Sequence, residues 1–239
     1  MARKRTRQPL ELIGFEETEE THIPLSRSRI TQSAIHLLNE LGLKELSMRK
    51  VAEDLSVQPA SLYYHVKGKD QLLQMLSDKI CSEMEWPDPS SPWREQILQW
   101  GEQFRKVLQG YRDAVELFNS TIGLGYNRLM QIEKLYQMLV AAGFEDRQIP
   151  WIASILKNYV LGFVAEEARF ASFADNSDAT PEQLSQQVNQ LFSSLSKEQF
   201  PNMIRLASFT TNTDWQQEFQ FGLGVLIDGL SIKLAPNPT

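Results

Sequence analysis

The chain has 239 residues, of which 42% are hydrophobic and 23% are charged, which is typical of a globular protein. Its single cysteine, Cys81, excludes a disulfide within the chain and a metal site built from several cysteines, and it favours the reducing cytoplasm. No apolar run approaches about 18 residues, so we expect neither a membrane span nor a signal peptide.

The net charge of −6 is unevenly distributed. Residues 1–70 contain 11 Lys and Arg against 10 Asp and Glu, whereas the rest of the chain contains 13 against 20. A weakly basic N-terminal part joined to an acidic body suits a small DNA-binding head on a body that does not touch DNA.

Residues 1–24 show no helical or strand period and are expected to form a flexible arm. The arm carries a basic cluster, Arg3, Lys4, Arg5 and Arg7, followed by an acidic stretch. Two interpretations remain open. Arg3 and Arg5 enter a minor groove rich in A·T pairs, or the arm is only a solubilising tail.

Residues 25–70 predict a head of three helices. Apolar residues at helical spacing predict a first helix after Ser26, a favoured N-cap, which ends at Gly42. A second helix is expected over 47–54, a turn at 56–58, and a third helix from Pro59 to about His65. Two short helices around a tight polar turn are typical of a helix-turn-helix.

Residues 71–239 predict a purely helical body. A fourth helix is expected from about Lys69 to Met84, and the proline-rich segment 86–92 then forms a stiff connector. The loop at 172–181 is expected to be mobile and 195–212 irregular. Further helices are expected at about 93–109, 111–123, 127–142, 147–171, 181–194 and 213–234. The fold class is therefore all-α, with the arm at 1–24, the head at 25–70 and the body at 71–239.

The head offers side chains suited to each type of DNA contact. Arg49 can reach a base edge or a phosphate, Gln58 can pair with adenine, and Ala60 can pack on a thymine methyl group. The other candidates are hydroxyl, imidazole and ammonium groups suited to phosphate contacts or, for Ser61, to a base edge. They are Ser61, Tyr63, Tyr64, His65, Lys67 and Lys69.

The head resembles the TetR family of bacterial transcriptional regulators, in its tetracycline-repressor-like branch. The resemblance is carried by Leu-Leu-Asn-Glu-Leu-Gly-Leu at 37–43, Arg-Lys-Val-Ala at 49–52 and, above all, Leu-Tyr-Tyr-His-Val-Lys-Gly-Lys at 62–69. The family's third helix often has its proline one position later than Pro59. The base contacts are therefore the least transferable part of the resemblance.

The resemblance continues in patches through the body, at 139–144, 160–166 and 219–223. It implies a ligand-binding regulatory domain and a homodimer formed by the helices at 147–171 and 213–234. Gly222, Gly224 and Gly229 support such an interface independently, because glycines inside a helix are costly unless backbones approach closely there. A twofold dimer would match a palindromic operator.

The body departs from tetracycline repressors at the residues that bind the drug and its metal. All three histidines precede residue 70, so we expect no histidine metal site in the body and no cofactor. The replacement residues predict a cavity for a mostly hydrophobic small molecule, oriented by Asn158. The other expected lining residues are Trp100, Phe104, Leu117, Leu135, Met138, Trp151, Ile155 and Tyr159.

The sequence therefore predicts a homodimeric repressor that an inducer releases from its operator. One alternative is a DNA-binding dimer without a small-molecule response, which the residues do not separate from the first interpretation. Another is a helical enzyme. This alternative is disfavoured because the body has no nucleophile–base pair, no glycine-rich phosphate loop and no histidine.

Overall fold

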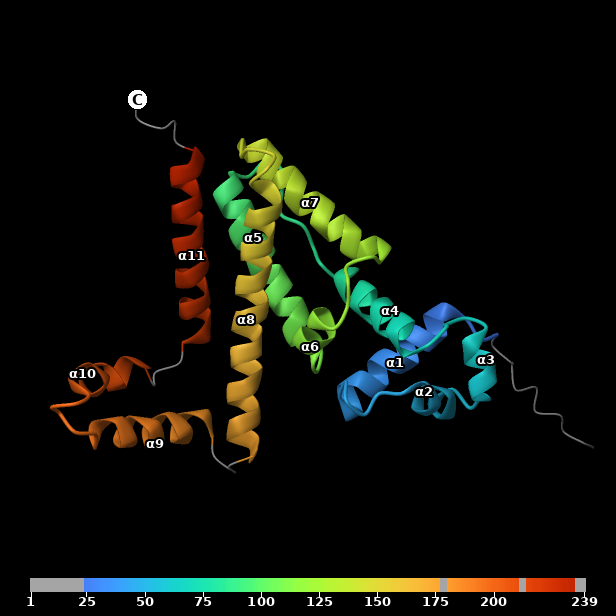
Figure 1. Ribbon diagram of the computed structural model, residues 1–239, viewed down its shortest axis with the longest axis horizontal. Coiled ribbons are helices and arrows are strands. Elements are labelled where there is room, and N and C mark those ends of the chain that lie inside the picture. The colour runs from blue at the N-terminus through green and yellow to red at the C-terminus, as the bar shows by residue number, and fades with distance from the viewer. Residues whose placement is uncertain (1–23, 177–179, 211–213, 235–239) are drawn as a thin grey trace, which may run out of the picture.

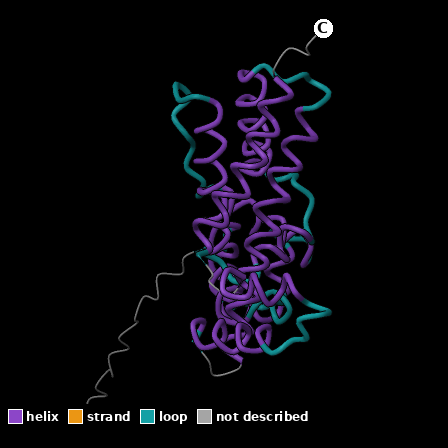
Figure 2. The backbone as a smooth tube through the Cα atoms, turned by 90° about the vertical axis from the view of Figure 1, so that its left-hand side faces the viewer, coloured by secondary structure: helices purple, strands orange, loops and turns teal. Residues whose placement is uncertain are grey.

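The computed structural model describes residues 24–176, 180–210 and 214–234. These residues form eleven α-helices joined by turns and loops, without a strand among them, which confirms the all-α fold (Figures 1 and 2). The helices are α1 (Arg27–Leu41), α2 (Met48–Asp54), α3 (Pro59–Tyr63), α4 (Lys69–Cys81), α5 (Trp93–Gln109), α6 (Ala114–Asn119), α7 (Tyr126–Ala142), α8 (Ile149–Asn176), α9 (Pro181–Ser193), α10 (Pro201–Thr210) and α11 (Trp215–Leu234).

Capping residues set the ends of the head helices at the expected positions. The hydroxyl of Ser26 accepts a hydrogen bond from the backbone N–H of Arg29 at the start of α1, and α1 ends at Gly42, which has a φ of 84°. Ser47 caps α2 in the same way, and Pro59 occupies the first position of α3.

The turn between α2 and α3 depends on Ser56, whose φ of 54° is unusual for a residue other than glycine. The turn closes with a 2.9 Å hydrogen bond from the Val57 N–H to the Ala52 carbonyl. It directs Leu62 into the hydrophobic core to which Ile30 and Leu38 also belong, and all three side chains are fully buried. The described head is thus a helix-turn-helix buttressed by α1.

Helix α4 belongs to both parts of the molecule. It packs against α1 in the head and against α5, α6 and α7 in the body (Figure 1). Leu72, Leu76 and Ile80 form its buried face. A displacement of α4 within the body would therefore move the head with it.

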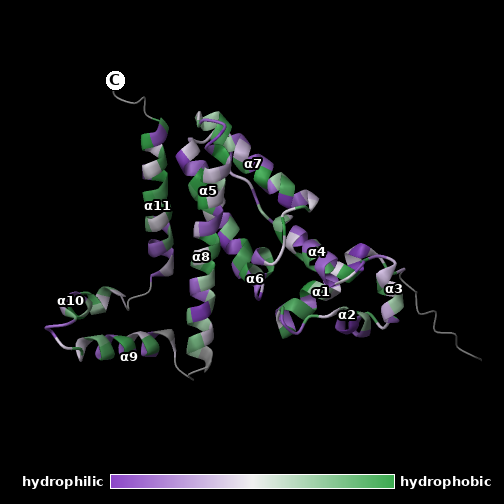
Figure 3. Cartoon of the chain, in the orientation of Figure 1, coloured by the Kyte–Doolittle hydropathy of each residue, from purple (hydrophilic) through white to green (hydrophobic). Residues whose placement is uncertain are grey.

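The body is built around α5, α7 and α8, with α11 beside α5 and α8 (Figure 1). Hydrophobic and hydrophilic residues alternate around these helices, as expected for amphipathic elements that share a core (Figure 3). Ile97, Leu108, Leu139, Leu156 and Phe219 are among the buried core residues. Within the described part of the chain, no helix is long and apolar enough to cross a membrane.

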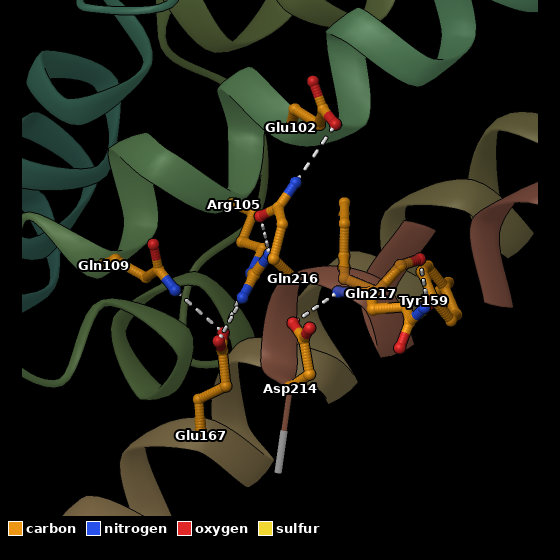
Figure 4. A network of polar contacts seen from close by, with 9 residues as sticks. Glu102, Arg105, Gln109, Tyr159, Glu167, Asp214, Gln216 and Gln217 are labelled. Atoms are coloured by element: carbon orange, nitrogen blue, oxygen red, sulfur yellow. Dashed lines mark hydrogen bonds and ion pairs between the residues drawn. The ribbon is translucent and has the colours of Figure 1, made fainter. Parts of the chain in front are cut away.

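A buried polar network ties α11 to this core (Figure 4). Arg105 on α5 forms an ion pair with Glu167 on α8 and donates a 2.8 Å hydrogen bond to the side chain of Gln216 on α11. Its guanidinium also lies 4.7 Å from the centroid of the Phe219 ring. Glu167 thus compensates the buried charge of Arg105, so removal of Glu167 alone would leave a buried cation unpaired.

The structure corrects three sequence predictions about the elements. The segment 195–212, expected to be irregular, contains a helix, since α10 runs from Pro201 to Thr210 and buries Ala207, whereas residues 195–200 are not helical. Helix α8 continues to Asn176, so residues 172–176 of the loop expected at 172–181 are helical, and residues 177–179 lie outside the described residues. The helix expected from 111 begins only at Ala114, because Asp113 has a φ of 55°.

Candidate functional site

The exposed side of the helix-turn-helix carries the predicted base-contacting side chains. The Arg49 side chain is 83% exposed and forms an ion pair of 2.8 Å with Glu53 one turn along α2. Gln58 and Ala60 are exposed at the start of α3, and Ser61 is half-buried beside them. Because Leu62 anchors the opposite side of α3 in the core, these groups face away from the protein.

The predicted phosphate-contacting side chains follow directly along the chain. Tyr64 is 90% exposed and Tyr63 is 52% exposed, while His65 is half-buried and its carbonyl oxygen accepts a 3.0 Å hydrogen bond from the Nε of Arg27. Lys67 and Lys69 are exposed on either side of Gly68, the N-cap of α4. The start of α4 therefore places two cations beside a helix N-terminus, where anions are favoured.

Of the nine predicted DNA contacts from Arg49 to Lys69, seven are exposed, and Ser61 and His65 are half-buried. Arg3 and Arg5, which were predicted to enter a minor groove, lie outside the described residues. Contact with DNA by any of these side chains stays a prediction.

A cavity of about 470 Å³ lies in the body between α4, α5, α7, α8 and the segment that contains α6. Its apolar wall includes Trp100, Phe104, Phe118 and Leu135, with Met84 from the segment after α4. The ring centroids of Phe104 lie 5.6 Å from Trp100 and 5.7 Å from Phe118. The volume is within the range of small-molecule sites.

Only three of the nine residues predicted to bind the ligand line this cavity: Trp100, Phe104 and Leu135. Leu117 is fully buried in the core, and Met138 packs against the core. Trp151, Ile155 and Asn158 are exposed on α8, outside the lining of the cavity. Tyr159 donates a 2.8 Å hydrogen bond to the Phe219 carbonyl and packs against Gly222, so it joins α8 to α11. A ligand role for these six residues stays a prediction.

Sequence reasoning missed the polar side of the cavity, which contains Asn119, Thr121, Arg128, Gln131, Ser154 and Lys157. Arg128 and Gln131 are three residues apart on α7, so they share one helical face. This spacing was visible in the sequence. Without knowledge of which face of α7 meets α4 and α5, however, it did not indicate a site.

Arg128 is held in place by neutral groups. Its guanidinium donates hydrogen bonds to the Thr121 hydroxyl at 2.6 Å and to the Phe118 carbonyl at 3.2 Å. Burial lowers its pKa, while the nearby carboxylate of Asp78 opposes that shift. Cys81 also lines the cavity, and burial raises the pKa of its thiol to about 12, so the thiol is neutral at physiological pH.

Two junctions connect the head to the helices around the cavity. At the first, Asp78 on α4 accepts hydrogen bonds from the side chain of Asn127 at 2.9 Å and from the backbone N–H of Arg128 at 3.0 Å. The carboxylate therefore caps the N-terminus of α7. It packs so closely that a Cβ atom at Gly125 would collide with it.

The second junction lies between the end of α1 and the segment that precedes α6. The carboxylate of Asp113 accepts a 2.8 Å hydrogen bond from the backbone N–H of Leu43. Arg112 donates a 2.7 Å hydrogen bond to the carbonyl of Glu40. Both elements that bear on Arg128, α7 and the segment 117–121, are thus connected to the head. Sequence reasoning identified neither junction.

Comparisons with known proteins match both the head and the body of the chain. A family model described as bacterial regulatory proteins, tetR family, matches residues 30–76, and one described as tetracyclin repressor-like, C-terminal domain, matches residues 86–234. The two matches cover the helix-turn-helix and the helices that enclose the cavity.

Individual relatives are similar over different parts of the chain. A transcriptional regulator of the helix-turn-helix type from Saccharopolyspora erythraea is 34% identical over 64% of this chain, and the matched part is 65% of that protein. The class E tetracycline repressor protein of Escherichia coli is 28% identical over 88% of this chain and 92% of its own length.

Among solved structures, the TetR family protein ActR from Streptomyces coelicolor, crystallised in complex with actinorhodin, superposes with a TM-score of 0.79. It is 29% identical, and the match covers 87% of this chain and 95% of ActR.

Proposed function

Since the chain belongs to the TetR family of bacterial regulatory proteins, we propose that it is a repressor released from a palindromic operator by a mostly hydrophobic small molecule. Repressors of this family are homodimeric DNA-binding regulators with a ligand-binding C-terminal domain. We assign its action to the bacterial cytoplasm, where the DNA target lies.

The observation that carries the proposal is the run of exposed polar side chains between Arg49 and Lys69, on and beside the helix-turn-helix. It combines an exposed arginine, two exposed tyrosines and two lysines beside a helix N-terminus, all supported by a buried core. Such a set of side chains suits insertion of the start of α3 into the major groove, with phosphates held at its flanks. We assign base contacts to Arg49 and Gln58 and phosphate contacts to Tyr64 and Lys69.

The proposed dimer forms through the outer faces of α8 and α11. Trp151 and Ile155 on α8 and Phe221, Val225 and Ile232 on α11 are large apolar side chains with 48% to 74% exposure in the single chain. A Cβ atom at Gly224 or Gly229 would meet nothing within 4 Å, so neither glycine is explained by packing inside one subunit. Burial of these faces against a second copy accounts for both features.

The proposed response to a ligand uses the junction at Asp78. A small molecule in the cavity contacts α7 and the segment 117–121, which together hold Arg128. Since Asp78 caps α7 from α4, a shift of α7 moves α4 and hence the head. The two heads of the dimer can lie at a spacing that fits the operator or at one that does not. A ligand that binds the second state more tightly lowers operator affinity by the difference between its binding free energies for the two states.

The decisive experiment is a fluorescence-anisotropy titration of the full-length dimer with duplexes from the DNA that flanks its gene. We expect tight binding to a palindromic duplex and weak, salt-sensitive binding to a scrambled one. Compounds that stabilise the protein in a thermal-shift screen of apolar aromatics should then release the duplex. Equal affinity for both duplexes would remove the DNA assignment.

Asp78→Ala tests whether ligand binding is coupled to DNA release, separately from DNA binding and ligand binding themselves. We expect the variant to bind the operator and the screened compound, but to release DNA less completely because the link from α4 to the N-terminus of α7 is lost. Glu145→Ala is the control, since it breaks a surface ion pair with Arg147 that lies far from α4 in the chain. Full release by Asp78→Ala would show that the signal travels another way.

A further inference from the structure

The charged groups that line the cavity are all cationic. Among the described residues that line it, Arg128 and Lys157 are the only ionisable side chains apart from Cys81 and Tyr136, and none is an Asp or Glu. A site for a neutral molecule does not require these two charges, and a half-buried cation such as Arg128 loses part of its hydration. The charge pattern of this cavity is thus complementary to an anion.

Arg128 is the cation best placed to bind such a group. Its guanidinium donates hydrogen bonds to the hydroxyls of Ser77 and Thr121 and to the Phe118 carbonyl, all of them neutral. Within the described parts of the chain, no carboxylate lies within ion-pair distance of its guanidinium. Asp78 is the nearby carboxylate, but its two oxygens are occupied at the N-terminus of α7. The guanidinium can therefore still form a charge-assisted hydrogen bond with an anionic group of a ligand.

Gln131, one helical turn from Arg128 on α7, has a hydrogen-bond acceptor that a ligand could pair with. Its Nε2 donates a 2.9 Å hydrogen bond to the Cys81 carbonyl, whereas its Oε1 is buried without a partner among the described residues. An unpaired buried acceptor costs about 1–3 kcal/mol, and a donor supplied by a ligand would recover part of that cost. The apolar wall formed by Trp100, Phe104, Phe118 and Leu135 lies in the same cavity.

We propose that the ligand of this cavity is an aromatic carboxylic acid, whose ring system lies against Trp100, Phe104 and Phe118 and whose carboxylate pairs with Arg128. A hydroxyl or N–H group on the same molecule donates to Gln131 Oε1. Lys157, which is exposed on α8 and lines the cavity, attracts the anion. This assignment names the class of the inducer in the proposed function and rests on that function.

The test compares two probes of the same ring system and similar size, the anionic anthraquinone-2-carboxylate and the neutral anthraquinone-2-carboxamide, in which an NH2 donor replaces one carboxylate oxygen. Binding to the full-length dimer is measured by isothermal titration calorimetry without DNA. We expect the carboxylate to bind at least about tenfold more tightly, as for a charge-assisted hydrogen bond in a desolvated site. In Arg128→Gln this preference should disappear, and in Arg128→Lys it should survive in part, because the charge stays but the planar fork is lost.

Arg147→Gln serves as the matched control, because this exposed arginine is paired with Glu145 and does not line the cavity. Its preference for the acid should equal that of the wild type. Thermal melts establish that each variant is folded. If Arg128→Gln does not fold, Arg128→Lys still tests the proposal. Equal binding of acid and amide by the wild type, an unchanged preference in Arg128→Gln, or no binding of the acid at millimolar concentration would each overturn the proposal.

Failure of this proposal is distinguishable from failure of the proposed function. If the acid binds through Arg128 but does not release the operator, the ligand assignment stands and the repressor mechanism fails. If other compounds release the operator while the acid and the amide bind alike, the mechanism stands and the acid assignment fails.

Discussion

The head and the body place their functional side chains in opposite ways. In the head, the candidate contacts come from one short stretch, Arg49 to Lys69, and point outward from a filled core. In the body, the candidate contacts point inward and come from five helices and the segments between them, from Cys81 to Lys157. A surface of this kind depends on local helix geometry, whereas a cavity depends on how distant helices pack. The two regions should therefore respond differently to mutation.

The largest effect is expected from Leu62→Ala, which breaks the head and spares the body. Leu62 on α3 is fully buried in the head core, and its truncation should cost about 2–5 kcal/mol of folding free energy. A head of this size cannot absorb such a loss, so operator binding should vanish in a mobility-shift assay. The reciprocal experiment is Leu139→Ala, which truncates an equally buried leucine of the body in place of one of the head. Loss of ligand binding by Leu62→Ala would refute the separation of the two regions.

A second large effect is expected from Val225→Arg, which tests how the body positions two heads. Val225 is 54% exposed in the single chain and lies on the proposed dimer face of α11. A charge buried there without a partner costs several kcal/mol, so the variant should sediment as a monomer in analytical ultracentrifugation. Leu191→Arg on α9 is the control, because Leu191 is also exposed but lies outside that face. A dimeric Val225→Arg protein would place the interface elsewhere.

A smaller effect, confined to the head, is expected from Arg49→Ala. Loss of an arginine contact should weaken operator binding by about 1–3 kcal/mol and leave the melting temperature nearly unchanged. If Arg49 reads a base, discrimination between operator variants falls, whereas a phosphate contact would reduce the salt dependence instead. Arg147→Ala provides the comparison, since Arg147 is a similarly exposed arginine in an ion pair. Unchanged affinity would remove Arg49 from the interface.

Sequence reasoning was strongest where structure is set by neighbours in the chain. Ser26, Gly42 and Pro59 act at helix ends within one or two turns, so the boundaries of α1 and α3 could be predicted from them. Seven of the nine side chains predicted to contact DNA between Arg49 and Lys69 are exposed, as the same local pattern indicates, and their contact with DNA stays a prediction. The fold class was correct for this reason. The prediction of an irregular segment at 195–212 was wrong for residues 201–210, where α10 forms and buries Ala207.

The lining of the cavity could be predicted only in part. Trp100, Phe104 and Leu135 were identified, because the resemblance located the helices that bear them. Arg128 was missed, since its position depends on Asp78, Thr121 and Phe118, which are up to 50 residues away in the chain. Sequence periodicity shows that a helix has an apolar side, but the orientation of that side toward a neighbour is a tertiary property.

The smallest effect is expected at Trp151, where the sequence expectation and the geometry differ. Trp151 was predicted to contact the ligand, yet its side chain is 65% exposed on α8 and does not line the cavity. We therefore expect Trp151→Ala to change the affinity for anthraquinone-2-carboxylate by less than about 0.5 kcal/mol, as for a surface substitution. Trp100→Ala, in contrast, should lose about 1–3 kcal/mol, because its ring lines the cavity.

Calorimetry on both variants measures the difference, and sedimentation of Trp151→Ala adds a second readout. If Trp151 belongs to the dimer face, its loss should raise the dimer dissociation constant even though the ligand affinity is unchanged. A large loss of ligand affinity in Trp151→Ala would mean that the cavity is completed across the subunit interface. The body would then share its ligand site between two copies, whereas each head would still read its half of the DNA alone.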